Sequence, residues 1–250
     1  MTNLIPKSHP RAQSLYVRER LVHAFDNGLV AKEGLMAHGR GEAFDYLVGE
    51  KTSKSAKNAI KAAAFALVTA EHPVISVNGN IAGLCPSEIV ELAKVVNAKI
   101  EINLFYSSNK RKQNILRIMQ KNGAKEILGI IKKNSTRISG LDSARRIVDK
   151  NGIYIADVVL VPLEDGDRTI ALKKAGKKVI TFDLNPLSRT AQTADITIVD
   201  NVVRGIKELI HTCVKMQEKK LHSMKFDNKK NLAESISEIR NYLEKRAKIA

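Results

Sequence analysis

Short runs of apolar, often β-branched residues recur along the chain after residue 70, and polar residues bound each run. Such runs are typical of strands that are buried on both faces of a parallel sheet. The clearest occupy residues 74–77, 158–161, 179–182 and 196–199. A more alternating run predicts a strand nearer an edge at 99–104, and a weaker sixth strand is predicted at 127–131.

Helical periodicity fills the intervals between these runs. Helices are predicted at residues 86–96, 109–122, 143–151 and 169–175, and the last three are each followed by glycine. Glycine is common just past the C-terminus of a helix. Strands alternating with helices indicate βαβ units, so we expect an α/β fold with a Rossmann-like, mainly parallel sheet and flanking helices.

The two ends of the chain differ from this alternating middle. Helices at 13–27, 43–49 and 53–71 predict a helical N-terminal lobe over residues 1–71, before an α/β core at 72–217. Residues 218–250 predict a charged helical tail. In that tail Leu232, Ile236, Ile239 and Leu243 share one helical face, which is typical of a docking or dimer seam. We expect the three parts to form one structural unit.

Polar residues follow five of the predicted strands directly. They include Asn80 after the first strand and Asn103 at the end of the second; the others are Asp165–Thr169, Asp183–Thr190 and Asp200-Asn201. Ligands of open parallel sheets bind outside the carboxyl ends of the strands. Because solvation alone would scatter polar clusters over both edges, this arrangement predicts an active site at one edge.

The residue types in two of these clusters suit a nucleotide. Asp183 and Asn185 can pair with ribose hydroxyls or base edges, and Ser188 and Arg189 offer a hydroxyl and a planar cation for phosphate. The alternative for this segment is a proline-containing turn between strand and helix. Asp200 and Asn201 alone would indicate only a helix cap.

Asp165 and Asp167 are candidate magnesium ligands, because Mg²⁺ binds one or two carboxylates together with phosphate oxygens. The alternative is a tight turn that caps the next helix.

The N-terminal lobe carries a second candidate group, His38-Gly39-Arg40-Gly41-Glu42. The two glycines predict a backbone that allows close approach and directs Arg40 outward, or else only a turn between helices. Arg18 lies about two helical turns after Arg11, so both are candidates for the same crevice. His38 is a candidate proton carrier.

Composition narrows the class of protein. The chain has 250 residues, 44% of them hydrophobic, and no signal peptide or membrane-length apolar run is evident, so we expect a soluble cytoplasmic protein. Its two cysteines lie far apart. A net charge of +16 indicates either anionic ligands or a lysine-rich surface, while 4% aromatic residues disfavours nucleic-acid recognition by stacking. Neither a P-loop nor a GxGxxG motif is present.

A series of long motifs carries a more specific signal. In order along the chain they are IPKSHPR, SLYVRE, GLMAHGRGEAFDYLVGE, VISVNGN, IEINLFY, ADVVLVPLEDGDRT, DLNPLSRT and IVDNVVR. With these motifs the sequence closely resembles archaeal phosphopantothenate synthetases, the 4-phosphopantoate–β-alanine ligases. The resemblance extends from about Ile5 to about Arg204, and we place residues beyond 217 outside it.

The resemblance implies an ATP-dependent ligase that condenses 4-phosphopantoate with β-alanine, releases AMP and diphosphate through an acyl-adenylate, and acts as a homodimer in coenzyme A synthesis. It implies ATP contacts at Arg18, Arg40, Asp183, Leu184, Asn185, Ser188, Arg189, Asp200 and Asn201. Arg40 and Mg²⁺ would offset the crowded negative charge, and His38 is the candidate base. Asn80, Asn103 and Arg168 are candidates for orienting phosphopantoate or the amine.

Two other functions remain open at this point. One is an ADP-forming ligase or a kinase that acts on a related acid. The other is a basic RNA-associated protein, which would leave the polar clusters at the strand ends without a purpose. We expect neither nucleic-acid nor membrane partners.

Overall fold

Six parallel strands form the central sheet of the protein. The structure is a computed structural model that describes residues 5–6, 8–9, 11–218 and 223–249. The strand order is β3-β2-β1-β6-β7-β8, and every neighbouring pair is parallel. The predicted α/β, Rossmann-like class is confirmed. The strands are β1 (Pro73–Val77), β2 (Lys99–Ile102), β3 (Ile127–Leu128), β6 (Val158–Leu160), β7 (Lys178–Phe182) and β8 (Ile196–Ile198).

The chain changes direction across the sheet between β1 and β6. From β1 it adds β2 and β3 on one side, and from β6 it adds β7 and β8 on the other. Loops that leave neighbouring strands in opposite directions open a crevice at such a switch point, where ligands of this fold class bind. Asn78, just after β1, donates from Nδ2 to the Leu163 carbonyl at 3.1 Å and so ties together the two loops beside the crevice.

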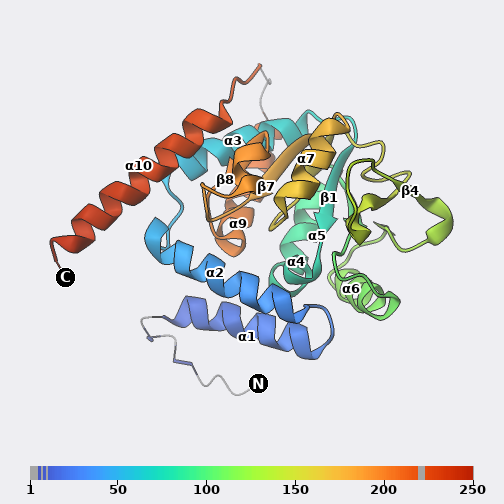
Figure 1. Ribbon diagram of the computed structural model, residues 1–250, viewed down its shortest axis with the longest axis horizontal. Coiled ribbons are helices and arrows are strands. Elements are labelled where there is room, and N and C mark those ends of the chain that lie inside the picture. Colours follow the sequence, from blue (N-terminus) through green and yellow to red (C-terminus); the bar gives the residue numbers. More distant parts are fainter. Residues whose placement is uncertain (1–4, 7, 10, 219–222, 250) are drawn as a thin grey trace.

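Apolar side chains cover both faces of the sheet. On β1, Ile75 and Val77 belong to one buried cluster and Val74 to another, because successive side chains of a strand point to opposite faces. Helices α3 (Lys54–Val68), α5 (Pro86–Val95) and α9 (Val202–Gln217) cover the first face. Helix α7 (Gly166–Lys174) covers the second, and the short α8 (Arg189–Thr193) packs beside it (Figure 1).

A two-stranded arm also packs on the second face, at the right of Figure 1. Strands β4 (Ser135–Arg137) and β5 (Ile147–Asp149) pair antiparallel, and single 3₁₀ turns precede them at Lys132–Asn134 and Ala144–Arg146. The predicted helix at 143–151 is therefore wrong. Gly152 ends no helix: a Cβ there would lie 2.2 Å from Oε2 of Glu101, so this glycine allows the arm to approach a buried carboxylate.

Helices α1 (Ala12–Asp26) and α2 (Lys32–Val48) lie side by side below the sheet in Figure 1, and α1 packs on α4 (Gly79–Leu84). Helix α6 (Asn109–Lys121) adjoins α4. Helix α2 begins well before the predicted 43–49. The motif with two glycines is therefore helical and not a turn, and no atom lies within 4 Å of a Cβ built on Gly39. Because glycine has a low helix propensity, the sequence pattern did not predict the first part of this helix.

Helix α10 (Asn228–Ala247) contains most of the predicted tail and packs on α2 and α3 (Figure 1). Leu232 is buried, whereas Ile236 and Leu243 remain exposed. The Ser55 amide and hydroxyl both donate to the Glu238 carboxylate. The predicted helical face is therefore a docking surface along part of its length. The boundaries of lobe, core and tail remain predictions, and residues 1–4, 219–222 and 250 lie outside the described residues. None of the described helices is long and apolar enough to cross a membrane.

The second face of β2 carries a buried carboxylate, Glu101. Its oxygens accept hydrogen bonds from the amides of Asp149 and Ile153, at 3.1 and 2.7 Å. Desolvation outweighs these bonds and raises the pKa of Glu101 from 4.5 to about 7.

This pKa predicts a pH dependence of stability. Between pH 4.5 and 7 the folded protein holds a proton on Glu101 that the unfolded chain releases, so the contribution of this group to stability is fully present below pH 4.5 and is lost as the pH rises toward 7. A shift of this size corresponds to about 3 kcal/mol. Urea unfolding of wild type and Glu101→Gln should show the wild type losing free energy of unfolding relative to the variant from pH 5 to 7.5. Parallel pH curves would contradict this account.

Candidate active site

A cavity of about 310 Å³ lies at the carboxyl edge of the sheet, where α2 crosses the strand ends. Its size is within the usual range for small-molecule sites. The loops after β1, β2, β6, β7 and β8 all contribute to the wall, so the cavity includes the switch point between β1 and β6. The predicted position of the polar clusters is the position of this cavity.

Six of the residues predicted from sequence line the cavity: His38, Arg40, Asn80, Asp165, Leu184 and Asn201. Arg40 is exposed, and Asn80 is fixed by donating from Nδ2 to the Gly34 carbonyl at 2.9 Å. The wall therefore includes a histidine and a cation from α2 and a carboxylate, Asp165, from the loop after β6, which is the mixture that acid–base chemistry on anions needs.

The nucleotide candidates after β7 form a compact loop beside the cavity. Asp183 accepts from the Asn185 amide at 2.9 Å and from the Ser188 hydroxyl, and burial raises its pKa. Ser188 caps α8 by accepting from the Ala191 amide. Leu184 alone reaches the cavity wall, while the side chain of Arg189 is 81% exposed. Hydrogen bonds within the loop thus hold Asp183, Asn185 and Ser188 together, while Arg189 extends into solvent with Asp167 3.6 Å away.

An ion-pair network fastens α2 to the end of β8. Arg204 donates to Asp45 at 2.8 Å and to Asp200 at 2.9 Å. Asp200 also accepts from the Thr52 hydroxyl at 2.7 Å, and Asn201 donates to Asp45 at 2.9 Å. Asp200 is therefore buried in structural contacts, and burial raises its pKa. The network sets the position of α2, and with it His38 and Arg40, above the sheet.

Arg11 and Arg18 converge on one carboxylate, as their spacing suggested. Arg18 binds Glu42 through two hydrogen bonds of 2.7 Å, and Arg11 and Tyr46 also donate to it. The bond from Arg18 contributes most to holding the pKa of Glu42 at about 2. Arg18 lies outside the cavity, in a neighbouring hollow that shares His38 and Glu42 with it.

His38 is half-buried between the cavity and this hollow. Desolvation lowers the pKa of its imidazole, against the attraction of Glu42. A histidine with a pKa below its usual 6.5 is neutral at pH 7 and can accept a proton.

Asn103 and Arg168 lie behind the cavity wall, with their side chains buried. Asn103 donates from Nδ2 to the carbonyls of Arg145 and Ile147, at 3.3 and 3.0 Å. Arg168 pairs with Glu164 and donates to the Ser76 hydroxyl at 3.1 Å. Neither side chain reaches the wall, so in this structure both hold other residues in place.

The two candidate metal ligands differ in position. Asp165 lines the cavity and accepts from Arg145 at 3.1 Å, whereas Asp167 lies outside it, 3.6 Å from Arg189. No cluster of three or more His, Cys, Asp or Glu side chains suited to a metal exists among the described residues. A magnesium ion here would therefore need phosphate oxygens to complete its ligands, with Asp165 as the available carboxylate.

Three charged residues of the cavity wall were not predicted from the sequence, Glu33 and two arginines. Arg111, in the first turn of α6, and Arg145, on the arm, both line the wall. Each lies in an ordinary charged stretch, with no glycine or proline motif to single it out. Glu42 stood within a quoted motif, yet its pairing with two arginines depends on how α1 packs on α2.

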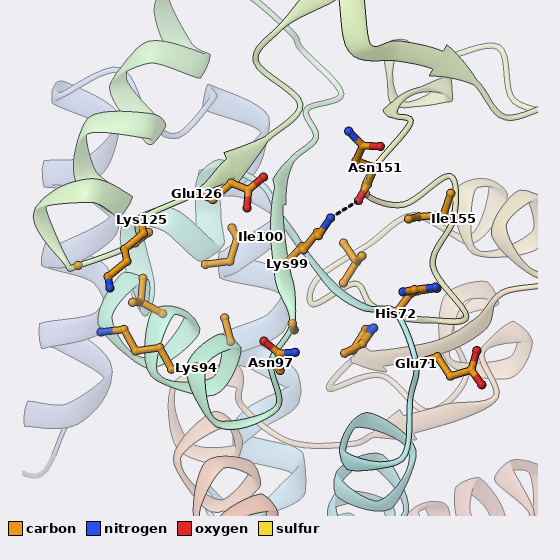
Figure 2. Close-up of a pocket in the computed structure, with 18 residues that line it drawn as sticks. Glu71, His72, Lys94, Asn97, Lys99, Ile100, Lys125, Glu126, Asn151 and Ile155 are labelled. Atoms are coloured by element: carbon orange, nitrogen blue, oxygen red, sulfur yellow. Dashed lines mark hydrogen bonds between the residues drawn. The ribbon is translucent and has the colours of Figure 1, made fainter.

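A larger cavity, of about 500 Å³, opens at the opposite edge of the sheet (Figure 2). It lies where β1 and β2 begin and where α3, α5 and α6 end. Helix C-termini carry partial negative charge, which accounts for Lys94 and Lys125 there. Lys99 donates to the Asn151 carbonyl at 3.1 Å. These cations thus have a structural explanation, and the edge that binds ligands in this fold class is the other one.

Comparisons with known proteins show the family of the chain. A model of the phosphopantothenate/pantothenate synthetase family matches residues 55–242. A 4-phosphopantoate–β-alanine ligase of Thermococcus kodakarensis is 52% identical over 245 residues, covering 96% of this chain and 93% of the relative. Ligases of the same name from Thermococcus onnurineus and Methanosarcina mazei are 51% and 47% identical, covering 97% and 96% of this chain and 95% of each relative.

The matched residues also correct one expectation. The tail beyond residue 217 was placed outside the resemblance, but the family model continues to residue 242 and so includes most of α10. The docking of α10 on α2 and α3 gives this match a structural basis. The chain belongs to the phosphopantothenate/pantothenate synthetase family.

Proposed function

We propose that the protein joins 4-phosphopantoate to β-alanine at the expense of ATP, forming 4′-phosphopantothenate, AMP and diphosphate. The observation that carries this proposal is the cavity at the carboxyl edge, lined by residues that follow five strand ends, in a chain about half identical to ligases of that name. The homodimer and the role in coenzyme A synthesis implied by the resemblance belong to the same proposal.

The reaction has two displacement steps. The phosphopantoate carboxylate attacks the α-phosphorus of ATP, a new P–O bond forms, and diphosphate leaves. The amine of β-alanine then attacks the acyl carbon of the adenylate, and AMP leaves with the C–O electron pair. Because only a neutral amine is nucleophilic, one proton must be removed. His38 is the candidate acceptor, since it lines the cavity and burial keeps its imidazole neutral.

The cavity has two ends, and we assign one to ATP and the other to 4-phosphopantoate. Arg40, Leu184 and Asn201 lie toward β7 and β8, next to the loop of Asp183, Asn185, Ser188 and Arg189. This is the end that we assign to ATP. Mg²⁺ bound beside Asp165 would reduce the repulsion between the phosphates and the attacking carboxylate. Arg40 would supply positive charge from α2, whose position the pairing of Arg204 with Asp45 fixes.

The products of a single incubation test this function. With ATP, 4-phosphopantoate, β-alanine and Mg²⁺, we expect AMP, diphosphate and 4′-phosphopantothenate in equal amounts by chromatography. Omitting β-alanine should leave diphosphate release limited to the enzyme concentration, because the adenylate stays bound. ADP as the nucleotide product would contradict the adenylate route and favour an ADP-forming ligase. No amide product would contradict the ligase proposal as a whole.

A further inference from the structure

Two arginines without an assigned role, Arg111 and Arg145, line the end of the cavity near β1 and β2. They come from α6 and from the arm, and the Phe105–Tyr106 loop lies with them in the wall. In each arginine the Nε–H group is buried and has no hydrogen-bond partner among the described residues. Unsatisfied buried donors are rare in native proteins and call for an explanation.

Arg111 has no acidic partner in the described part of the chain. Its guanidinium donates to the carbonyl of Tyr106 and, at 2.9 Å, to that of Leu29, and no carboxylate oxygen lies within 4 Å. Desolvation lowers the pKa of Arg111. A Cβ at Gly79 would lie 2.2 Å from the Leu29 carbonyl oxygen, the same oxygen that accepts from Arg111, so glycine is needed there for this close approach. Burying a cation is costly unless an anion lies close to it, and the carboxylate that attracts Arg111, that of Glu33, makes no ion pair with it.

Arg145 is more deeply buried, with 8% of its side chain exposed. It pairs with Glu164 and Asp165, and its guanidinium carbon lies 5.8 Å from the centre of the Phe105 ring. Glu164 also pairs with Arg168, so these two guanidiniums and two carboxylates balance one another. Among the described residues, Arg111 therefore has no ion-pair partner at this end of the cavity, although Glu33 in the same wall offsets part of its charge at longer range.

Two polar side chains, one in β2 and one just after it, hold the arm that carries Arg145. Asn103 donates to the carbonyls of Arg145 and Ile147, and Glu101 accepts from the amides of Asp149 and Ile153. Residues 101 and 103 point to the same face of the strand, opposite the apolar Ile102. The central sheet thus fixes the backbone of Arg145 itself, and Asn103 is a positioning residue for that arginine.

We propose that Arg111 and Arg145 form the subsite for the phosphate monoester of the second substrate, with Asn103 positioning Arg145. This inference rests on the proposed function. The carboxylate of that substrate must meet the α-phosphorus of ATP at the end near β7 and β8. The phosphate group, at the other end of the same acid, then extends toward β1 and β2, where the two arginines lie. A dianionic phosphate matches two guanidiniums that line the same end of the cavity.

Binding measurements on single variants test the subsite. Calorimetric titration of wild type should show 4-phosphopantoate binding more tightly than pantoate, which lacks the phosphate. Arg111→Gln and Arg145→Lys should each weaken 4-phosphopantoate binding about tenfold to hundredfold and leave pantoate and ATP binding nearly unchanged. Arg137→Gln, an exposed arginine on the same arm, is the matched control and should bind 4-phosphopantoate as wild type does.

The positioning role of Asn103 has its own readout. Asn103→Ala should raise the KM for 4-phosphopantoate several-fold with little change in the KM for ATP, and should have no further effect in an Arg145→Lys background. Additive effects would assign Asn103 to general stability and overturn the positioning role. Normal 4-phosphopantoate affinity in Arg111→Gln or Arg145→Lys would overturn that arginine's place in the subsite. A wild-type protein that forms no amide product would instead contradict the proposed function.

Discussion

Arg189→Ala is expected to lower kcat/KM by about 10²- to 10³-fold, the cost typical of losing one group that stabilises transition-state charge. The resemblance places this residue among the ATP contacts, and the structure leaves its side chain 81% exposed at the start of α8. Its one ion pair, with Asp167, spans 3.6 Å. Because the fold makes so little use of this guanidinium, a loss of activity would report on phosphate binding. Steady-state kinetics measure it.

A matched control exists on α10. Arg240 is 70% exposed and lies 3.7 Å from Glu244, so its surroundings resemble those of Arg189, but it lies on a helix that contributes nothing to the cavity wall. Arg240→Ala should retain wild-type kinetics. Both variants should keep the wild-type melting temperature, since exposed pairs contribute little to stability. Near-normal turnover by Arg189→Ala would remove this arginine from the nucleotide site.

The central strands could be predicted from sequence because burial on both faces leaves a continuous apolar run, as at residues 179–182. The arm could not. Residues 143–151 have helix-like spacing and end at a glycine, but the buried oxygens of Glu101 recruit their amides, and Val148 packs on the sheet. The contact that determines the structure of the arm is made by Glu101, more than 40 positions earlier in the chain. The local pattern of residues 143–151 therefore could not predict it.

The candidate site likewise contains residues that could be predicted from the sequence and residues that could not. Residues that directly follow strands, such as Asn80 and Asn201, could be located because parallel strands bring their carboxyl ends to one edge. Arg111 and Arg145 enter the cavity from α6 and the arm, and only the packing of those elements places them there. Asn103 shows the converse: it was correctly placed at a strand end, yet it lies behind the wall.

A buried cluster of charged side chains, Glu164, Arg145 and Arg168, is expected to affect the stability of the fold strongly. The Glu164 carboxylate, 2% exposed, lies between Arg145 and Arg168, which are 8% and 1% exposed. Desolvation lowers the pKa of each of these two arginines to about 10, so both remain charged at pH 7. Glu164 thus pairs with two cations that the fold has removed from water, and in the described part of the chain only Arg145 has a second carboxylate, that of Asp165, within ion-pair distance.

Glu164→Ala should lower the free energy of unfolding by about 3–5 kcal/mol, because it leaves buried arginines without their counter-ion. Urea denaturation followed by circular dichroism measures this loss. Glu244→Ala is the control, since Glu244 and Arg240 have the same i,i+4 spacing as Glu164 and Arg168 but are exposed; it should cost less than about 0.5 kcal/mol. The double variant Glu164→Leu/Arg168→Leu should lose less than the sum of the two single leucine variants, because removing both partners leaves fewer unpaired charges. If Glu164→Ala were as stable as Glu244→Ala, water would have to reach the charges behind the wall. That result would contradict the account in which a buried ion-pair cluster stabilises the cavity wall.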